Sequence, residues 1–326
     1  MTLRGPDVPF SLARFTTPTG PRPALVVGER LRPLSAVDLG GHEDVIDYLA
    51  EPDWDHLAHL AASDGPWRSL DDVELTSPVS PRHVFQAGAN YRTHVVQLIM
   101  AEMARRDDGR TPEEVRADAE KVMDARAASG SPFIFLGLSG CVVGPNEPLV
   151  LPAGADTHDW ELELAAVIGR EAFKVEPGEA LSYVAGYTIV NDITTREYVF
   201  PGDIGGIGAD WFRSKNAPGF LPTGPFLVPA PFVDPSDLLI ELQLNGEVMQ
   251  QESTAELVFD TAAIIAAASQ TTRLLPGDLI LTGSPSGNGQ HWGRFLRDGD
   301  VMTGSITHLG TQVVRCVAES TAGAQA

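Results

Sequence analysis

The stretch DWELELAAVIG, residues 159–169, decides which kind of fold this chain adopts. Successive side chains of a β-strand point to opposite faces, so Glu161 and Glu163 share one face while Leu162 and Leu164 share the other. The AAVI that follows is apolar on both faces, which predicts a strand buried inside a sheet. Two carboxylates on one face of a buried strand repel each other and lose hydration, so their charge needs a counter-charge.

Two interpretations of this glutamate pair are open. A divalent cation would balance buried carboxylates, because hard cations prefer oxygen ligands. Alternatively, the strand lies exposed at a sheet edge and its glutamates are solvated, since buried glutamates are rare. Asp192 favours the cation, because it ends the apolar stretch VAGYTIVN at 184–191, where a carboxylate can face a site. The predicted ligands of a Mg²⁺ or Mn²⁺ ion are therefore Glu161, Glu163 and Asp192.

The region around this stretch is predicted to be rich in β-strands. Pro276-Gly277-Asp278 and Asp298-Gly299-Asp300 are typical of tight turns. A single helix, over 254–271, is expected between 132 and 318, so strands do not alternate with helices as a Rossmann fold requires. The sequence therefore predicts a mixed, β-rich α/β fold. The expected strands are 132–137, 148–152, 160–169, 184–192, 238–246, 278–283 and 312–317.

Changes in composition predict a small N-terminal α/β domain over 1–77, a catalytic domain over 78–318 and a flexible tail over 319–326. The N-terminal domain has a helical stretch over 44–62, and the proline-bearing segment 73–84 is typical of a linker. Residues 95–130 are expected to be helical, because Thr111 is a good N-cap and is followed by proline and, at the third helical position, glutamate. This helical stretch is interpreted either as a solvated surface element or as a lid beside a site.

Composition excludes several classes of protein. The 326 residues include 44 acidic and 23 basic side chains, for a formal charge of −21, which disfavours binding to nucleic acids and anionic membranes. Cys141 and Cys316 are too few for a disulfide framework or a cysteine-rich zinc site. His291 and His308 stand alone and are interpreted as surface or loop residues. No signal peptide is evident and no apolar run approaches the roughly 18 residues of a membrane span, so a soluble cytoplasmic protein is expected.

Short motifs follow one another in a fixed order from residue 88 to residue 287. They are Gly88-Ala89-Asn90-Tyr91-x-x-His94, Gly144-Pro145, Leu151-Pro152, Asp159-Trp160-Glu161-Leu162-Glu163, Gly186-Tyr187, Asn191-Asp192-Ile193-Thr194-Thr195-Arg196, Lys215, Pro222-x-Gly224-Pro225, Asn245-Gly246-Glu247, Pro276-Gly277-Asp278 and Thr282-Gly283-Ser284-Pro285-Ser286-Gly287. Together they resemble the fumarylacetoacetate hydrolase family. Because the matches are collinear, the resemblance is far more specific than any single motif.

The resemblance implies a catalytic domain built as a mixed β-sandwich roll, preceded by a small N-terminal domain, and a homodimer. It implies that the three carboxylates bind Mg²⁺ or Mn²⁺ and that the substrate is a 2-oxo acid, commonly with a second carbonyl at C4. The reactions expected of such a protein are C–C hydrolysis, decarboxylation, hydration or tautomerisation. The chemistry agrees, because a 2-oxo acid can chelate a metal that then stabilises the enolate formed when the C3–C4 bond breaks.

The resemblance also implies roles for single residues. His94 resembles a general base that deprotonates water for attack at C4, and Lys215 would stabilise developing negative charge. A structural histidine and a surface lysine are the alternatives. Gln97 lies at i+3 from His94, within hydrogen-bonding reach on a helix. The expected substrate-binding residues are Tyr91, Arg196, Thr282 and Gly283. Arg196 would position Asp192 or the substrate carboxylate, and Thr282 would hold that carboxylate through its hydroxyl and backbone.

The sequence departs from the family pattern at three positions. Gln97 stands where a glutamate is common, and a neutral amide cannot take a proton from His94. Gly137 stands where a lysine is common, which removes a positive charge. Val199 stands where a glutamine is common, which removes a polar contact. These changes suggest an altered or less polar substrate and leave the predicted metal ligands intact.

Three hypotheses about function follow. The leading one is a divalent-metal-dependent hydrolase that cleaves a C–C bond in a 2,4-dioxo acid. The second keeps the metal and the enolate but gives a decarboxylase, hydratase or tautomerase, which Gln97 favours because enolate chemistry needs less activation of water. The third is a non-catalytic protein that binds a 2-oxo acid, which the missing glutamate and lysine support.

Overall fold

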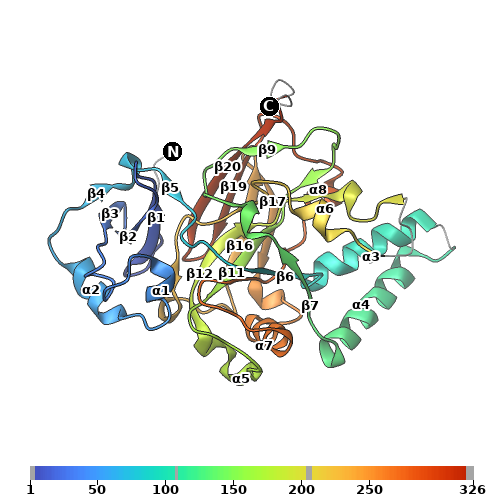
Figure 1. The fold of residues 1–326 in the computed structure, drawn as a ribbon. Coiled ribbons are helices and arrows are strands. Elements are labelled where there is room, and N and C mark those ends of the chain that lie inside the picture. Colours follow the sequence, from blue (N-terminus) through green and yellow to red (C-terminus); the bar gives the residue numbers. More distant parts are fainter. Residues whose placement is uncertain (1–3, 107–108, 203–207, 321–326) are drawn as a thin grey trace.

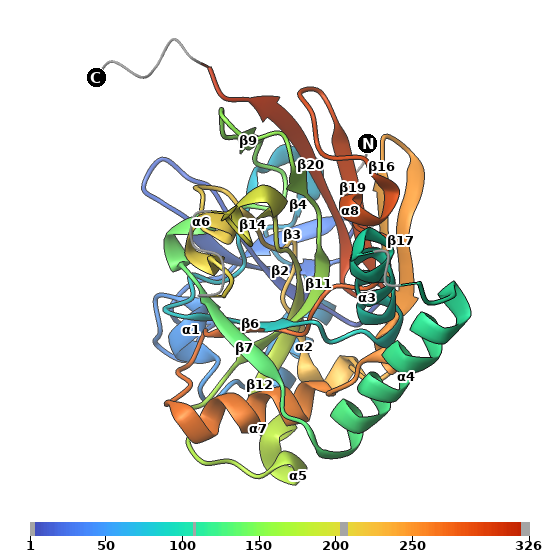
Figure 2. The ribbon, with the colours of Figure 1, turned by 90° about the vertical axis from the view of Figure 1, so that its right-hand side faces the viewer.

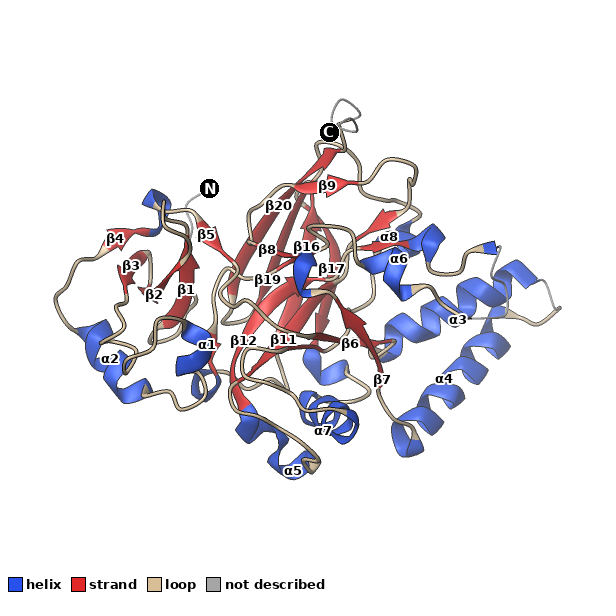
Figure 3. Cartoon of the chain, in the orientation of Figure 1, coloured by secondary structure: helices blue, strands red, loops and turns tan. Residues whose placement is uncertain are grey.

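The computed structural model describes residues 4–106, 109–202 and 208–320. Three larger sheets, two short strand pairs and helices of 4 to 18 residues make up this part of the chain (Figure 1). Helices lie to the left, to the right and below the long strands in the view of Figure 3. The expected mixed, β-rich α/β fold is confirmed. The described residues include no helix with the length and apolarity needed to cross a bilayer.

The N-terminal sheet has the strand order β4-β3-β2-β1-β5. Its strands are β1 (Ser11–Phe15), β2 (Arg22–Val27), β3 (Arg30–Pro33), β4 (Arg68–Ser69) and β5 (Leu75–Thr76), and its helices are α1 (Val45–Tyr48) and α2 (Trp54–Ala62). The single helical stretch expected over 44–62 is wrong in that it is two helices. Pro52 lacks an N–H and Asp53 begins α2 by accepting a hydrogen bond from the His56 N–H at 2.8 Å.

The central sheet is six-stranded, with the order β15-β12-β11-β18-β6-β7. Its strands are β6 (Val84–Gly88), β7 (Phe133–Gly137), β11 (Leu162–Ile168), β12 (Val184–Asn191), β15 (Val228–Pro229) and β18 (Leu279–Leu281). Strand β11, the decisive stretch of the sequence, pairs with β12 on one side and β18 on the other. All seven of its residues are buried. The exposed edge strand considered for this segment is therefore wrong, and the buried strand is confirmed.

A five-stranded sheet with the order β17-β16-β19-β20-β9 packs against the central sheet. Its strands are β9 (Leu149–Leu151), β16 (Leu239–Leu244), β17 (Glu247–Ser253), β19 (Val301–Ile306) and β20 (Gly310–Ala318). Leu162 and Leu164 of β11 lie in the same apolar core as Leu242 and Met302 of this sheet. Ala165 and Val167, on the opposite face of β11, belong to a second core shared with the N-terminal unit. Both faces of β11 are thus covered, as its continuous apolar pattern predicts.

Two-stranded pairs and helices complete the fold. The pairs are β8 (Val142–Val143) with β14 (Leu221–Pro222), and β10 (His158–Asp159) with β13 (Thr194–Thr195). The remaining helices are α3 (Arg92–Arg106), α4 (Pro112–Ser129), α5 (Pro177–Ala180), α6 (Trp211–Lys215), α7 (Thr261–Thr271) and α8 (Gly289–Trp292). The expectation of a single helix between 132 and 318 is wrong, because the short helices α5, α6 and α8 also lie there. The helix expected over 254–271 starts later, because Asp260 caps α7 by accepting from the Ala263 N–H at 2.8 Å. Single 3₁₀ turns occupy 70–72, 139–141, 181–183, 196–198, 230–232 and 254–256.

The helical stretch expected over 95–130 consists of two helices, α3 and α4. Figures 1 and 2 show them side by side, on the opposite side of the molecule from the N-terminal sheet. The predicted capping box is confirmed: Thr111 caps α4, and the Glu114 side chain accepts a hydrogen bond from the Thr111 N–H at 2.8 Å. A lid function for this pair stays a prediction.

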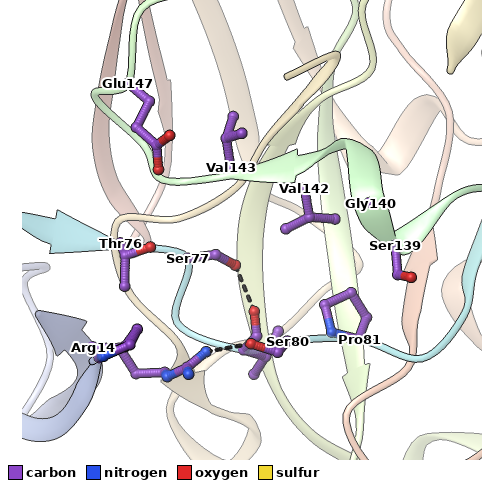
Figure 4. Close-up of a pocket in the computed structure, with 12 residues that line it drawn as sticks. Arg14, Thr76, Ser77, Ser80, Pro81, Ser139, Gly140, Val142, Val143 and Glu147 are labelled. Carbon is purple, nitrogen blue, oxygen red and sulfur yellow. Dashed lines mark hydrogen bonds between the residues drawn. The ribbon is translucent and has the colours of Figure 1, made fainter. Parts of the chain in front are cut away.

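A cavity of about 400 Å³ lies between the N-terminal sheet and the rest of the chain (Figure 4). Arg14 of β1 points across it and donates a hydrogen bond to the Ser80 hydroxyl at 2.6 Å. A second tie lies beside it, where Leu12 and Leu227 exchange backbone hydrogen bonds at 2.8 Å. We propose the domain boundary after residue 77, between β5 and β6. Most of the expected tail, 321–326, lies outside the described residues.

Gly304 is expected to limit the packing of the two large sheets. A Cβ atom added to Gly304 of β19 would lie 2.6 Å from a terminal carbon of Leu162. We expect Gly304→Ala to lower the free energy of unfolding by about 1–3 kcal/mol, because an overpacked core must shift. The same change should have a smaller effect in a Leu162→Ala background, where the methyl has room. Urea unfolding of the four proteins measures this coupling.

Gly178→Ala is the matched control, since a Cβ there meets nothing within 4 Å. It should leave stability unchanged or slightly raised. Equal losses from Gly304→Ala in the two backgrounds would contradict the proposed contact between the sheets.

Candidate active site

Three carboxylates meet where β11 begins and β12 ends. The antiparallel register pairs Leu162 with Asn191, which brings Glu161, just before β11, beside Asp192, just after β12. Glu163 follows Glu161 by two residues along the strand, so both side chains point to the same face. One oxygen from each of the three carboxylates lies within 4.8 Å of the others, and all three side chains are buried.

Two cationic side chains reach this group of acids. The Lys215 ammonium, at the end of α6, donates to Glu161 at 2.7 Å and makes a short contact with Asp192. Arg196, at the start of the turn after β13, donates to Glu161 at 2.5 Å and to Asp159 at 2.6 Å. Of the two partners expected for Arg196, Asp192 is not the one contacted in the structure, and the substrate carboxylate stays a prediction. Asp192 follows β12 on the side of Lys215, whereas the guanidinium reaches β10.

The buried charges do not balance. When ionised, the carboxylates of Asp159, Glu161, Glu163 and Asp192 outnumber the cations of Lys215 and Arg196 by two. A buried net charge is costly, and an ion of charge +2 would remove it. Carboxylate oxygens are also the donors that Mg²⁺ and Mn²⁺ prefer. The residues therefore fit a divalent cation held by the three carboxylates of Glu161, Glu163 and Asp192.

The pKa directions report the same imbalance. Burial, together with the charges of Asp192 and Glu161, raises the pKa of Glu163 well above its usual range. Burial raises the pKa of Asp192 to about 6, although Lys215 opposes the shift. Burial would also raise the pKa of Glu161, but Arg196 and Lys215 override it and hold that pKa well below its usual value. Without a cation, Glu163 and Asp192 thus tend to bind protons.

Asp159 was not among the predicted site residues. It is fully buried and accepts hydrogen bonds from the Trp160 N–H at 2.8 Å and from the Gly289 N–H at the start of α8 at 2.5 Å. Its other oxygen accepts from Arg196. Asp159 therefore fixes the guanidinium that holds Glu161. The Asp-Trp-Glu motif contained this signal, since its aspartate precedes a buried strand.

His94 lies in the first turn of α3 and is buried. Burial lowers its pKa to about 4, which the Glu161 charge opposes and the charges of Arg196, His291 and Lys215 reinforce. His94 is therefore a neutral imidazole near neutral pH, with a lone pair that can accept a proton. The exposed His291 of α8 lies near enough to act on it, so its interpretation as an isolated surface residue is incomplete.

The other predicted residues have different surroundings. The Thr282 hydroxyl and N–H both bond to the Leu164 carbonyl at 3.0 Å, so they hold the backbone of β11. The Gly283 N–H donates to Glu163 at 2.8 Å. Asn90, also not predicted individually, donates to the carbonyls of Phe259 and Thr282. These bonds tie the segment after β6 to the end of β18.

Within the part of the chain that the structure describes, three buried polar atoms of the β6–α3 segment have no hydrogen-bond partner. They are the amide oxygens of Gln86 and Gln97 and the hydroxyl of Tyr91. Burial and the charges of Glu163 and Glu252 raise the pKa of Tyr91 well above its usual range, so its hydroxyl keeps its proton and can donate. The Gln97 oxygen accepts no hydrogen bond, so this atom does not hold His94. Unpartnered buried groups beside a charged site are expected where a ligand supplies the partner.

Gln86 holds Asp192 from the side opposite Lys215. Its amide nitrogen donates to one Asp192 oxygen at 2.5 Å, while Lys215 contacts the other oxygen. The Gln86 amide oxygen faces Gly137 on the neighbouring strand β7, where an added Cβ would lie 2.8 Å from it. Glycine at 137 therefore leaves room for an uncharged amide at Asp192. Sequence motifs did not identify Gln86, because its partners lie far away along the chain.

Comparisons with known proteins agree on the family. The family model "Fumarylacetoacetate (FAA) hydrolase C-terminal" matches residues 83–317. The mitochondrial oxaloacetate tautomerase fahd2 of Xenopus laevis is 37% identical over 246 residues, which cover 74% of this chain and 68% of that protein. The 2,4-didehydro-3-deoxy-L-rhamnonate hydrolase of Sphingomonas sp. (strain SKA58) is 40% identical over 187 residues, 56% of this chain and 63% of that one. The solved structure of fumarylacetoacetate hydrolase from Exiguobacterium antarcticum has a TM-score of 0.74 at 27% identity, covering 95% of this chain and 100% of its own.

Metal binding should release protons. Because the pKa values of Asp192 and Glu163 are raised, the metal-free site holds protons that a cation must displace. We expect Mg²⁺ affinity to fall as the pH falls through about 6. Mg²⁺ should accordingly raise the melting temperature more at about pH 7 than at about pH 5. Differential scanning calorimetry with and without Mg²⁺ measures this difference.

Glu163→Gln is the matched variant for this measurement. Among the described residues Glu163 forms no salt bridge, so its removal leaves Lys215 and Arg196 paired. It should abolish most of the Mg²⁺ effect at every pH. A Mg²⁺ effect independent of pH in the unaltered protein would contradict the raised pKa values.

Gly137→Ala should weaken metal binding by moving Gln86. The amide is the flexible end of its side chain, so the added methyl displaces it at little cost to the fold but breaks its bond to Asp192. We expect a loss of Mn²⁺ affinity of about 10- to 100-fold, as is usual when a partner of a metal ligand is removed. Titration followed by electron paramagnetic resonance of free Mn²⁺ measures the affinity.

Gln86→Met should reproduce this loss, since it removes the donor directly. Gly140→Ala is the control, because a Cβ at Gly140 meets nothing within 4 Å. Unchanged Mn²⁺ affinity in both Gly137→Ala and Gln86→Met would show that Asp192 does not depend on this amide.

Proposed function

Because this chain belongs to the fumarylacetoacetate hydrolase family, we propose that it is a divalent-metal-dependent hydrolase that cleaves the C3–C4 bond of a 2,4-dioxo acid. The observation that carries the proposal is the buried set of three carboxylates beside two paired cations and a neutral histidine. The predicted metal ligands Glu161, Glu163 and Asp192 keep that role in the proposal. The homodimer and the cytoplasmic location expected from the sequence stay predictions.

A divalent cation bound by the three carboxylates would supply Lewis-acid stabilisation of negative charge on the carboxylate and C2 oxygens of a 2-oxo acid. The chain itself supplies the remaining functions. Lys215, charged because three carboxylates raise its pKa against burial, keeps Glu161 and Asp192 in place and offsets their repulsion. Arg196, fixed by Asp159, does the same for the other oxygen of Glu161.

His94 is the proposed general base. Its neutral imidazole takes a proton from water while the water oxygen bonds to the C4 carbonyl carbon. The C3–C4 bond then breaks, its electron pair passes to the 2-oxo acid fragment, and that fragment takes up a proton at C3. The products are a carboxylic acid from the C4 side and a 2-oxo acid such as pyruvate. Tyr91, with an unpartnered buried hydroxyl, is the proposed donor to the substrate.

Tautomerisation of a 2-oxo acid is the second candidate. Gln97 favours it, because the position following His94 by one turn holds an amide that cannot relay a proton for hydrolysis. The similar protein from Xenopus laevis carries the name oxaloacetate tautomerase, whereas the one from Sphingomonas is named as a hydrolase of a 2,4-didehydro-3-deoxy acid. Both activities would use the same carboxylates and base. Product analysis separates them.

Hydrolysis predicts two acids in equal amounts. We expect purified protein with Mg²⁺ to convert an acylpyruvate into pyruvate and the corresponding carboxylic acid, followed by nuclear magnetic resonance. His94→Asn should lower kcat by about 10²- to 10⁴-fold, the usual contribution of a general base. The same variant should still bind oxalate in the presence of Mg²⁺, because it leaves the carboxylates intact.

A shifted double bond or hydrogen exchange at C3 without a second acid would support the tautomerase instead. Oxalate binding without turnover of any dioxo acid would support a binding protein. If oxalate fails to bind to folded protein with Mg²⁺, the metal proposal itself is wrong.

A further inference from the structure

Three aromatic side chains form a wall on one side of the carboxylates. Phe133 and Phe135 share a face of β7, since residues two apart point the same way along a strand, and Trp211 begins α6. The ring of Phe135 stacks on Trp211 with centroids 4.7 Å apart and planes inclined by 16°. The ring centroids of Phe133 and Trp211 are 6.1 Å apart. We call Phe133, Phe135 and Trp211 the aromatic wall.

The aromatic wall is continuous with the proposed active site. Trp211 and Lys215 are four residues apart on α6, so they project from the same side of the helix. The Lys215 ammonium that contacts Glu161 and Asp192 lies 5.6 Å from the centroid of the Phe135 ring. One helix thus carries both a cation for the carboxylates and a ring for the wall.

The wall retains surface for a ligand. Phe133 is 47% exposed, and Phe135 and Trp211 are half-buried. A flat apolar group placed against these rings would gain stacking and lose its contact with water. The wall is therefore expected to bind a hydrocarbon ring more tightly than a small or charged group.

Where the wall meets the carboxylates, the flanking positions Gly137 and Gln86 carry no charge. The wall face of β7 ends at Gly137, beside the neutral amide of Gln86. Lys215 and Arg196 each already contact two carboxylates. A second carboxylate on the ligand would thus approach acids whose cations are engaged, which is unfavourable. Val199, buried and apolar, follows the turn that carries Arg196.

We infer that the group on the C4 carbonyl of the substrate is a flat, uncharged, apolar one, such as a phenyl ring, which lies against the aromatic wall. This inference rests on the proposed binding of a 2,4-dioxo acid by the three carboxylates. The substrate class it names is the aroylpyruvates, which carry one carboxylate and an aromatic acyl group. Dioxo acids with a second carboxylate at the far end are expected to bind more weakly.

Equilibrium competition against oxalate tests the inference without requiring turnover. The ligands are 4-phenyl-2,4-dioxobutanoate, 2,4-dioxopentanoate with a methyl in place of the ring, and a 2,4-dioxo acid ending in a carboxylate. Mg²⁺ is present throughout, and His94→Asn protein is used because it should consume the ligand far more slowly. We expect the phenyl compound to bind most tightly and the dicarboxylate most weakly.

Two variants locate the ring. Phe135→Leu and Trp211→Leu keep apolar volume but remove the flat surface, and each should weaken the phenyl compound by about 3- to 10-fold, the scale of an aromatic pair. Oxalate and the methyl compound should keep their affinities, which a general disturbance of Lys215 would not allow. Phe212→Leu is the matched control, because Phe212 neighbours Trp211 on α6 but is 73% exposed and lies outside the wall.

Equal losses for the phenyl and methyl compounds, or tightest binding of the dicarboxylate, would overturn the inference. A change of particle mass in Phe135→Leu and Trp211→Leu with unchanged ligand preference would also overturn it, because the wall would then be a contact between copies of the chain. Absence of oxalate binding in the protein with intact wall residues would instead show that the proposed function has failed.

Discussion

The structure depends on the repulsion among four buried carboxylates that two cationic side chains offset only in part. The pairing of β11 with β12 places Glu161 beside Asp192, and the surrounding segments converge to hold them. Asp159 holds Arg196 through a salt bridge. Lys215 is the last residue of the five-residue helix α6, and its side chain is buried next to the carboxylates. Burying such a cluster costs free energy of folding unless a bound cation balances its negative charge. In the proposed site, metal binding and the folding of this region would be linked.

The residues surrounding the cluster keep its charge unbalanced. Gln86 holds Asp192 through a neutral amide, and Gly137 provides the space for it. A cationic side chain at position 137 or 86 would reduce the net negative charge of the carboxylates and so weaken their attraction for a cation. The neighbouring β7 residues on this face, Phe133 and Phe135, are also uncharged. One strand face therefore borders both the proposed metal site and the proposed binding surface for the ligand. The site thus combines strong attraction for a cation with an apolar wall beside it.

The sequence predicts what local patterns encode. The alternation in DWELELAAVIG predicts the buried strand and the shared face of Glu161 and Glu163, because strand geometry fixes both. Capping residues predict the start of α4. The apolar patterns over 44–62 and 254–271 are continuous, but Pro52 and Asp260 interrupt the helices there, so that α2 and α7 start later than the patterns alone predict. Gln86 and the true partner of Arg196 were missed, because those contacts join segments 106 and 37 residues apart. Such contacts follow from tertiary packing, which a periodicity does not contain.

We propose that Glu161, Glu163 and Asp192 bind one divalent cation to which a 2-oxo acid binds. A crystal structure of the protein with Mn²⁺ and oxalate, measured at a wavelength where manganese scatters anomalously, tests it most directly. We expect one strong anomalous peak within coordination distance of all three carboxylates, with oxalate bound to it on the side of the aromatic wall. An empty cluster at saturating Mn²⁺, with Lys215 still bridging Glu161 and Asp192, would contradict it.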